Sequence, residues 1–319
     1  MRKKKILIIN TCHYCGGMLV LSELCKCLVR QGYDAKLILF YNFPRKEEDL
    51  FLFRTKLLIN HMKLIIARLL VFFFPKGNFE KKYFSDFFTA RHLKGCKIQF
   101  CPFFSKRKTI VIYTELVFGN PLKARNVVRW LLFHYPYANI PNAYKKDDLF
   151  ICYKDFFNNL ELNPSKKKTL IMHFDAELYK RTNFGERRGK CFIIRKGENR
   201  KDLPSSFDGR IIDNLTEEEK VKVFNECEYC YSFDTQTFYS CIASICGCKS
   251  IVVMEPGKTK ADYFHPDDGE HLGIAWGNSL EEIKLAESSR KALLESLDYT
   301  KQNEENTLRF ISYLEDHFS

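Results

Sequence analysis

One stretch, residues 231–256 (YSFDTQTFYSCIASICGCKSIVVMEP), constrains the fold of this chain most. Its pattern predicts, in order, a strand, a polar loop, a helix of small residues, a glycine that ends the helix, and a buried strand. The helix is expected over 238–246, with Thr237 as a candidate cap and Gly247 as the C-terminal stop. The β-branched run 250–254 is typical of a strand in a parallel sheet. A strand-to-helix loop of this kind favours an anion site, with phosphate as the usual occupant.

The same alternation of strands and helices occurs in two blocks along the chain. In the first block, we expect strands over 5–10, 35–41, 109–113, 149–153 and 169–173, and helices over 18–31, 50–74 and 121–133. In the second block, we expect strands over 191–195, 210–213, 229–233, 250–254 and 273–276, and helices over 217–226, 238–246 and from Ser279 onward. Such β-α-β connections predict parallel sheets with right-handed crossovers.

The polar run NPSKKK at residues 163–168 marks the edge of the expected interdomain linker. We therefore predict an N-terminal Rossmann-like domain over 1–165, a second Rossmann-like domain over 166–302, and a C-terminal helix within 303–319. A length of 319 residues suits two domains that each bury a core.

Charge is spread unevenly along the chain, although the overall net charge is only +12. Residues 1–200 hold 39 Lys and Arg against 16 Asp and Glu, whereas residues 201–319 hold 12 against 23. The first two-thirds are therefore expected to face an anionic partner. No zinc-finger spacing, RNP-type motif or convincing helix-turn-helix is present, so an anionic membrane surface is favoured over nucleic acid.

Residues 50–74 are predominantly apolar but are interrupted by five basic residues, namely Arg54, Lys56, His61, Lys63 and Arg68. A basic amphipathic helix of this kind can lie in a membrane interface. The alternative is a core helix with a cationic outer face, and the sequence leaves both open.

Thirteen cysteines lie largely inside apolar runs, which indicates reduced core residues of a cytosolic protein. Two CxxC pairs, at 12–15 and 227–230, fall in separate domains with no zinc ribbon around them, so no metal site is expected. The start MRKKKILIIN has too few apolar residues for a signal peptide, and no segment reaches the ~20 apolar residues of a membrane span. We therefore expect a cytoplasmic protein, peripheral at the inner face of the cytoplasmic membrane.

Polar residues follow the ends of several expected strands. In open parallel sheets, ligands bind beyond the carboxyl ends of the strands. The candidates at such ends are Gly16, Gly17, Glu115, Arg195, Lys196, the loop 234–237 and Glu255. Gly16 and Gly17 are expected to form a tight loop that a ligand can approach closely. Because all of these candidates fall at the carboxyl ends of strands in the two domains, we predict an active site between the domains.

Four segments together carry a family resemblance: the 231–256 unit, RKG at 195–197, YTE at 113–115 followed by GNP and NVVRW, and HLGIAWG at 271–277. They resemble GT-B-type bacterial glycosyltransferases that build lipopolysaccharide or other surface polysaccharide. The resemblance implies an α/β fold with two Rossmann-like domains facing each other across a cleft. It also implies a nucleotide-sugar donor as co-substrate, no further cofactor, no metal, and a C-terminal helix that packs back on the first domain.

Donor binding is assigned to the second domain by this resemblance. Arg195 and Lys196 are candidates to stabilise the diphosphate leaving group, and the alternative is a solvated pair. Thr235, Thr237, Tyr239 and Ser240 cluster at the helix start, where they either contact phosphate or only cap the helix. Asp234 either accepts hydrogen bonds from sugar or ribose hydroxyls or orders the loop, and Glu255 is an alternative hydroxyl acceptor.

An inverting transferase needs a general base for the acceptor hydroxyl. Glu115 is the first candidate and His13 the second, and neither is required in a retaining enzyme. A salt bridge between Glu115 and Arg129 is the structural alternative. Asn120 is expected to cap the helix predicted over 121–133.

The predicted function is thus transfer of a sugar from a nucleotide-sugar to a glycolipid or oligosaccharide acceptor in bacterial lipopolysaccharide or capsule biosynthesis. One alternative is a non-catalytic nucleotide- or carbohydrate-binding protein. Another is a Rossmann-type enzyme such as a dehydrogenase, against which the missing GxGxxG fingerprint counts.

Overall fold

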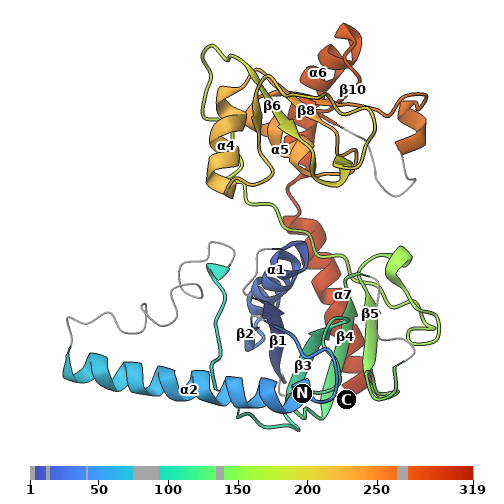
Figure 1. The fold of residues 1–319 in the computed structure, drawn as a ribbon. Helices are drawn as coiled ribbons and strands as arrows, with labels where there is room; N and C mark the ends of the chain where they lie inside the picture. Colours follow the sequence, from blue (N-terminus) through green and yellow to red (C-terminus); the bar gives the residue numbers. More distant parts are fainter. Residues whose placement is uncertain are drawn as a thin grey trace. The chain divides into compact units, whose positions relative to one another are not determined.

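The computed structural model describes residues 4–11, 15–40, 42–74, 93–101, 103–133, 140–263 and 272–318. The chain divides into two compact units (Figure 1). Unit 1 comprises Met1–His173 and Thr300–Ser319, and unit 2 comprises Phe174–Tyr299. The segment 166–173 thus lies with unit 1, whereas the sequence places the domain boundary at 165/166.

Unit 1 contains a five-stranded sheet of order β2-β1-β3-β4-β5, in which every neighbouring pair is parallel. The strands are β1 (Lys5–Thr11), β2 (Ala35–Phe40), β3 (Thr109–Thr114), β4 (Asn126–Leu131) and β5 (Leu149–Cys152). The helices are α1 (Gly16–Arg30), α2 (Asp49–Phe73), the 3-10 turn η2 (Asp155–Phe157) and α7 (Thr300–Phe318).

Alternate residues of these strands face two separate cores. On one face, Ile6, Ile8 and Trp130 pack with α1 and with Phe310 and Leu314 of α7. On the other face, a second core forms against the first turns of α2, from Leu7, Ile9, Ile38, Phe40, Phe53 and Leu57. Because a core covers each face of this sheet, its strands are predominantly apolar in sequence, as is usual for a parallel sheet that is buried on both sides.

The helix predicted over 121–133 is wrong, because residues 126–131 form β4, with all six residues buried. Pro121 follows a turn at Gly119 and Asn120, as a proline at a helix start often does, but Val127 and Val128 favour a strand. Asn120 caps no helix; its side chain accepts a hydrogen bond from the N–H of Ala124 and donates one to the carbonyl of the same residue (2.9 and 2.8 Å).

The strand predicted over 169–173 is also wrong, since these residues belong to no strand and the isolated bridge between Cys152 and Lys168 ends just before them. Side-chain amides of α7 take the place of a neighbouring strand. Asn303 accepts from the N–H of Met172 and donates to its carbonyl (2.9 and 2.8 Å), and Asn306 donates to the carbonyl of Leu170 (2.8 Å). These amide contacts satisfy backbone groups that a sequence pattern assigns to a sheet.

Unit 2 contains a second parallel five-stranded sheet, of order β10-β9-β8-β6-β7. Its strands are β6 (Lys190–Ile193), β7 (Arg210–Ile211), β8 (Tyr229–Ser232), β9 (Lys249–Val252) and β10 (Ala275–Trp276). Its helices are α4 (Glu217–Glu226), α5 (Tyr239–Cys246), α6 (Leu280–Ser296) and the 3-10 turns η3 (Arg195–Gly197) and η4 (Lys260–Tyr263).

Local signals in the sequence explain the helix ends of unit 2. Thr216 and Glu219 form a capping box before α4, and Ser279 accepts from the N–H of Glu282 at the start of α6. Gly247 ends α5 in the left-handed conformation (φ 105°), as predicted. The expected fold class, an α/β protein with two Rossmann-like parallel-sheet domains, is confirmed.

Helix α2 differs from the others because most of its long apolar side chains are exposed. The exposed ones are Phe51, Leu52, Leu58, Ile59, Met62, Ile65, Ile66, Leu69, Phe72 and Phe73. None of the helices in the described part of the chain combines the length and the apolar content that crossing a membrane requires.

Candidate functional site

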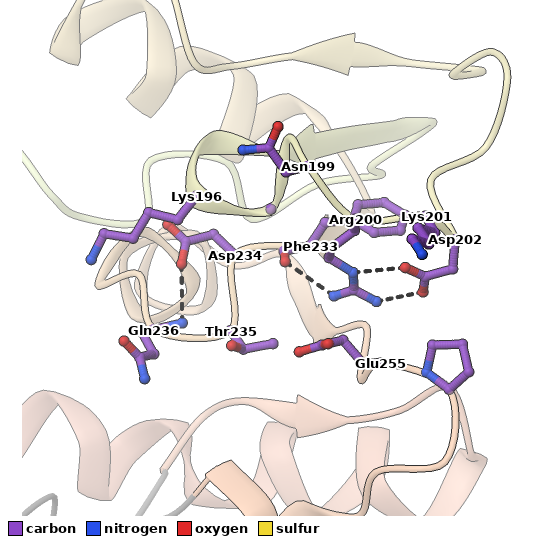
Figure 2. A pocket seen from close by; sticks show the side chains of 12 residues that line it. Lys196, Asn199, Arg200, Lys201, Asp202, Phe233, Asp234, Thr235, Gln236 and Glu255 are labelled. Atoms are coloured by element: carbon purple, nitrogen blue, oxygen red, sulfur yellow. Dashed lines mark hydrogen bonds and ion pairs between the residues drawn. The ribbon is translucent and has the colours of Figure 1, made fainter.

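A pocket of about 640 Å³ lies in unit 2 at the carboxyl ends of β6, β8 and β9 (Figure 2). This edge is where open parallel sheets bind their ligands. The residues after β6 contribute Lys196, Gly197, Asn199, Arg200, Lys201 and Asp202; those after β8 contribute Phe233, Asp234, Thr235 and Gln236; those after β9 contribute Glu255 and Pro256.

The wall after β6 is a tight 3-10 turn, η3, held against the end of β8. Asp213 accepts hydrogen bonds from the N–H groups of Ile194 and Arg195 (3.2 and 2.7 Å), which fixes Arg195 at a positive φ of 39°. A Cβ on Gly197 would lie 2.5 Å from the carbonyl oxygen of Phe233. Glycine is therefore needed at 197 for the close approach of two backbones.

Arg200 lines the pocket and links the backbone segments that follow β8 and β9. Its guanidinium donates to the carbonyl oxygens of Phe233 (3.1 Å), Val253 (2.7 Å) and Met254 (3.2 Å). It also forms a two-pronged pair with Asp202 (3.0 and 2.6 Å), drawn as dashed lines in Figure 2. This contact lowers the pKa of Asp202 and raises that of Arg200. The sequence does not single out Arg200, because its role depends on carbonyl groups 33 and 53 residues away.

The two adjacent cations of η3 are placed differently. Arg195 does not line the pocket; its Nε lies 3.8 Å from Oδ2 of Asp234, and its guanidinium lies 5.0 Å from the centre of the Tyr239 ring. Lys196 lines the pocket, and no ion pair within the described part of the chain involves its ammonium group. The structure thus brings Lys196, rather than Arg195, to the pocket wall.

Asp234 is 3% exposed and orders the loop after β8. Its Oδ1 accepts from the N–H of Gln236 (3.1 Å), and its Oδ2, next to Arg195, has no hydrogen bond within the described residues. The loop therefore presents Thr235 and Gln236 to the pocket. On the opposite wall, Glu255 lines the pocket with one carboxylate oxygen 3.0 Å from Nζ of Lys258.

The remaining candidates at the start of α5 do not line this pocket. Thr237 lies one residue before the N-cap of α5 and accepts from the N–H of Tyr239, the first residue of the helix (3.3 Å). The Tyr239 hydroxyl donates to Glu217 (2.6 Å) and accepts from Lys220 (3.1 Å), and burial together with Glu217 raises its pKa. Ser240 is buried at 1% exposure. The Tyr239 contacts join α5 to α4. The prediction that Thr237 caps the helix is wrong, because α5 begins one residue later than expected and Phe238, which has no capping side chain, occupies the N-cap position.

Glu115 follows β3 in unit 1 and is 2% exposed. Its Oε2 accepts from the N–H of Leu132 (2.8 Å). Burial raises the pKa of Glu115 to about 6, and the N–H groups of Leu132 and Phe133 oppose that rise. A carboxyl with this pKa is half ionised near pH 6 and mostly ionised at neutral pH, so it can accept a proton there as a general base does.

No ion pair between Glu115 and Arg129 forms. Arg129 is fully buried, pairs with Asp148 (2.9 Å) and donates to the carbonyls of Val117 and Gly119. Its guanidinium lies 4.9 and 5.1 Å from the ring centres of Tyr113 and Tyr144. Arg129 therefore fixes the loop that follows Glu115.

Gly16 and Gly17 do not form the expected tight loop, because they are the first two residues of α1. Neither has a positive φ, and a Cβ on Gly16 would meet nothing within 4 Å. A Cβ on Gly17 would lie 3.5 Å from Leu132, whose N–H binds Glu115, so Gly17 and Glu115 share one edge of the unit 1 sheet. His13 lies outside the described residues.

The second CxxC pair consists of two buried thiols. Cys227 and Cys230 pack with Cys191 and Cys248 in the core of unit 2 as free cysteines. Over the part of the chain that the structure describes, no group of three or more His, Cys, Asp or Glu side chains is placed to hold a metal ion.

Comparison with known proteins gives only structural similarity. No protein-family model matches the chain, and no curated protein matches it. An alpha-glucosyltransferase (AGT) in complex with UDP aligns over 99% of this chain and 96% of its own, with 10% identity and a TM-score of 0.40. The glycosyltransferase SnogD from Streptomyces nogalater aligns over 99% and 96% (12% identity, TM-score 0.33), and the spinosyn forosaminyltransferase SpnP over 99% and 95% (8% identity, TM-score 0.32). Similarity at this level assigns no activity to the chain.

Proposed function

We propose that this chain is a nucleotide-sugar-dependent glycosyltransferase of the GT-B type, with the donor bound by unit 2. The observation that carries the proposal is the unit 2 pocket, where Lys196 and Lys201 stand beside an ordered polar loop and a carboxylate. Sugar transfer leaves a nucleoside diphosphate, and fixed cations can stabilise its charge without a metal ion. We assign this role to Lys196. Lys201 lines the same pocket, and Arg195 precedes Lys196 in the turn η3.

Hydroxyl recognition falls to the opposite side of the same pocket. Glu255 can accept hydrogen bonds from sugar or ribose hydroxyls, and Thr235 can donate or accept them. Asp234 holds the loop in place through the N–H of Gln236. A dehydrogenase would need the same edge of the sheet for a dinucleotide, and a non-catalytic protein would bind without turnover.

For an inverting reaction, Glu115 of unit 1 is the proposed general base. Its burial and its raised pKa favour proton uptake from an acceptor hydroxyl near neutral pH. Tyr144 donates to the Glu115 carbonyl (2.7 Å) and Leu132 to its carboxylate, so the side chain is held in one orientation. Glu115→Gln keeps the shape but removes the base.

The proposed acceptor is a glycolipid or oligosaccharide of bacterial lipopolysaccharide or capsule biosynthesis, reached at the inner face of the cytoplasmic membrane. Two features support this: the basic excess of residues 1–200, and α2, which exposes large apolar side chains together with Lys56 and Lys63. A helix of this kind can lie flat in an anionic interface.

The donor assignment is tested by Lys196→Ala. We expect it to weaken binding of the cognate nucleoside diphosphate by ~1–3 kcal/mol, the scale of a hydrogen bond to a charged group, in isothermal titration. Lys222→Ala, which removes an exposed lysine of α4 (73% exposed), is the matched control and should bind as the unaltered protein does. Equal affinity in both variants would remove Lys196 from the site.

A further inference from the structure

A second pocket, of about 460 Å³, lies in unit 1 at the opposite edge of the sheet from Glu115. It is bounded by Lys5 and Lys36, which lie at the amino ends of β1 and β2, and by one side of α2. The third wall is residues 97–101, which run beside β2: the N–H of Leu37 donates to the Lys97 carbonyl (2.8 Å) and that of Gln99 to the Leu37 carbonyl (2.7 Å).

Basic side chains dominate the lining of this pocket. Lys5, Lys36, Arg68 and Lys97 line it together with His61, and no Asp or Glu stands among the lining residues within the described ranges. Lys36 has an acidic neighbour, Asp34, at 3.5 Å, and Lys5 donates to Gln99 (2.5 Å). Burial, with Lys36 next, lowers the pKa of Lys5. Like charges gathered in a partly enclosed space repel one another unless an anion lies between them.

His61 supplies an independent observation. Its Nδ1 is buried and has no hydrogen-bond partner within the described part of the chain. The side chain comes from α2, one turn before Leu64 and two turns before Arg68, and lines the same pocket. Buried polar atoms are normally paired, so this ring nitrogen lacks a partner that a ligand could supply.

We propose that the unit 1 pocket binds the phosphate group of a ligand, supplied by a lipid headgroup or by a soluble phosphate compound. Phosphate carries enough charge to offset several cations, and an arginine can hold two of its oxygens at once while lysines add point charges. Met62, Ile65 and Leu69, exposed on α2 beside the pocket-lining residues of the same helix, would suit a lipid source. The proposal does not depend on the sugar-transfer function.

Hydrogen exchange locates the binding without any variant. Inorganic phosphate should protect peptides that cover residues 55–70 and 97–101, relative to the same ionic strength of chloride. Vesicles of phosphatidylcholine with phosphatidic acid are the second probe, compared with phosphatidylserine vesicles of equal charge. Protection by phosphate alone identifies a soluble source, and stronger protection by phosphatidic acid vesicles identifies a lipid source. No protection of these peptides by either probe would overturn the proposal.

A pair of double variants measures the contribution of the cations. Lys36→Gln with Lys97→Gln removes two charges from the pocket, whereas Lys222→Gln with Lys291→Gln removes two charges from exposed positions of unit 2. The pocket variant should bind the probe that protects these peptides at least tenfold more weakly, and the control should stay within about twofold of the unaltered protein, since each charged contact to phosphate contributes measurably. Equal affinity of the two double variants would contradict the proposal. Because Lys36 is partly exposed and Lys97 is exposed, circular dichroism melts should show both double variants folded.

Discussion

The two pockets lie at opposite ends of their parallel sheets and differ in how their charges are balanced. At the carboxyl ends of the unit 2 strands, cations stand close to carboxylates: Arg200 with Asp202, Arg195 with Asp234, and Lys258 with Glu255. At the amino ends of the unit 1 strands, four basic side chains line a wall that includes no carboxylate among its described residues. The first arrangement can distinguish ligands by hydroxyls as well as by charge, whereas the second recognises charge.

One arginine organises the loops at the carboxyl edge of each sheet, fully buried Arg129 in unit 1 and partly buried Arg200 in unit 2, and substitutions of these two should have the largest effects. Arg129→Met should cost about 3–5 kcal/mol of unfolding free energy, because it leaves Asp148 buried and two carbonyls unpaired. Arg200→Met should cost about 3 kcal/mol, somewhat less, because Asp202 is 25% exposed and can be solvated. Urea denaturation measures both. Lys201→Met, at an exposed neighbouring position, should change stability by less than about 0.5 kcal/mol; a similar loss there would show that Arg200 has no special role.

Two glycine substitutions, one in each unit, should have smaller effects on stability and opposite signs. Gly197→Ala should destabilise unit 2 by about 1–3 kcal/mol, because the added methyl group meets the Phe233 carbonyl. Gly16→Ala should be neutral or stabilising by up to about 1 kcal/mol, since it adds a methyl in open space within a helix. Thermal melts of the two variants check this contrast. A destabilised Gly16→Ala protein would contradict the placement of Gly16 in α1.

A further predicted effect concerns the pH dependence of stability at Glu115. Its folded pKa, about 6, lies above the ordinary value of 4.5, so the folded state binds the proton more tightly than the unfolded state does. Stability should therefore fall by up to about 2 kcal/mol as pH rises from about 4.5 to above 6. Glu115→Gln should remove this slope while keeping an oxygen for the Leu132 N–H. Urea melts of both proteins at pH 4.5 and 7.5 test it, and identical pH dependence would refute the shifted pKa.

The periodic parts of the sequence predicted most of the fold, because strands and helices in α/β proteins follow local apolar patterns. The helix ends at Thr216, Gly247 and Ser279 follow from capping chemistry that acts within four residues. The errors lie where distant contacts decide. Residues 126–131 form a strand between β3 and β5, and residues 169–173 are held by side chains of α7.

The same distinction between local patterns and distant contacts explains which parts of the candidate site the sequence predicted. The sequence placed Lys196, Asp234, Thr235 and Glu255 at strand ends, and the structure brings all four to one pocket. It could not tell that Tyr239 turns its hydroxyl toward α4 or that Arg200 binds three carbonyls, because both depend on which strands lie side by side. Polar residues at a strand end predict an edge of the sheet, but not the direction of each side chain.

The central claim, that unit 2 binds the diphosphate of a nucleotide-sugar, is tested most directly by thermal shift of the unaltered protein against UDP, GDP, ADP, CMP and NAD, each with and without a chelator. A ligand present well above its dissociation constant should raise the melting temperature. The account predicts a shift with one nucleoside diphosphate that persists in the chelator. A shift with NAD alone, or no shift with any nucleoside diphosphate, would contradict it.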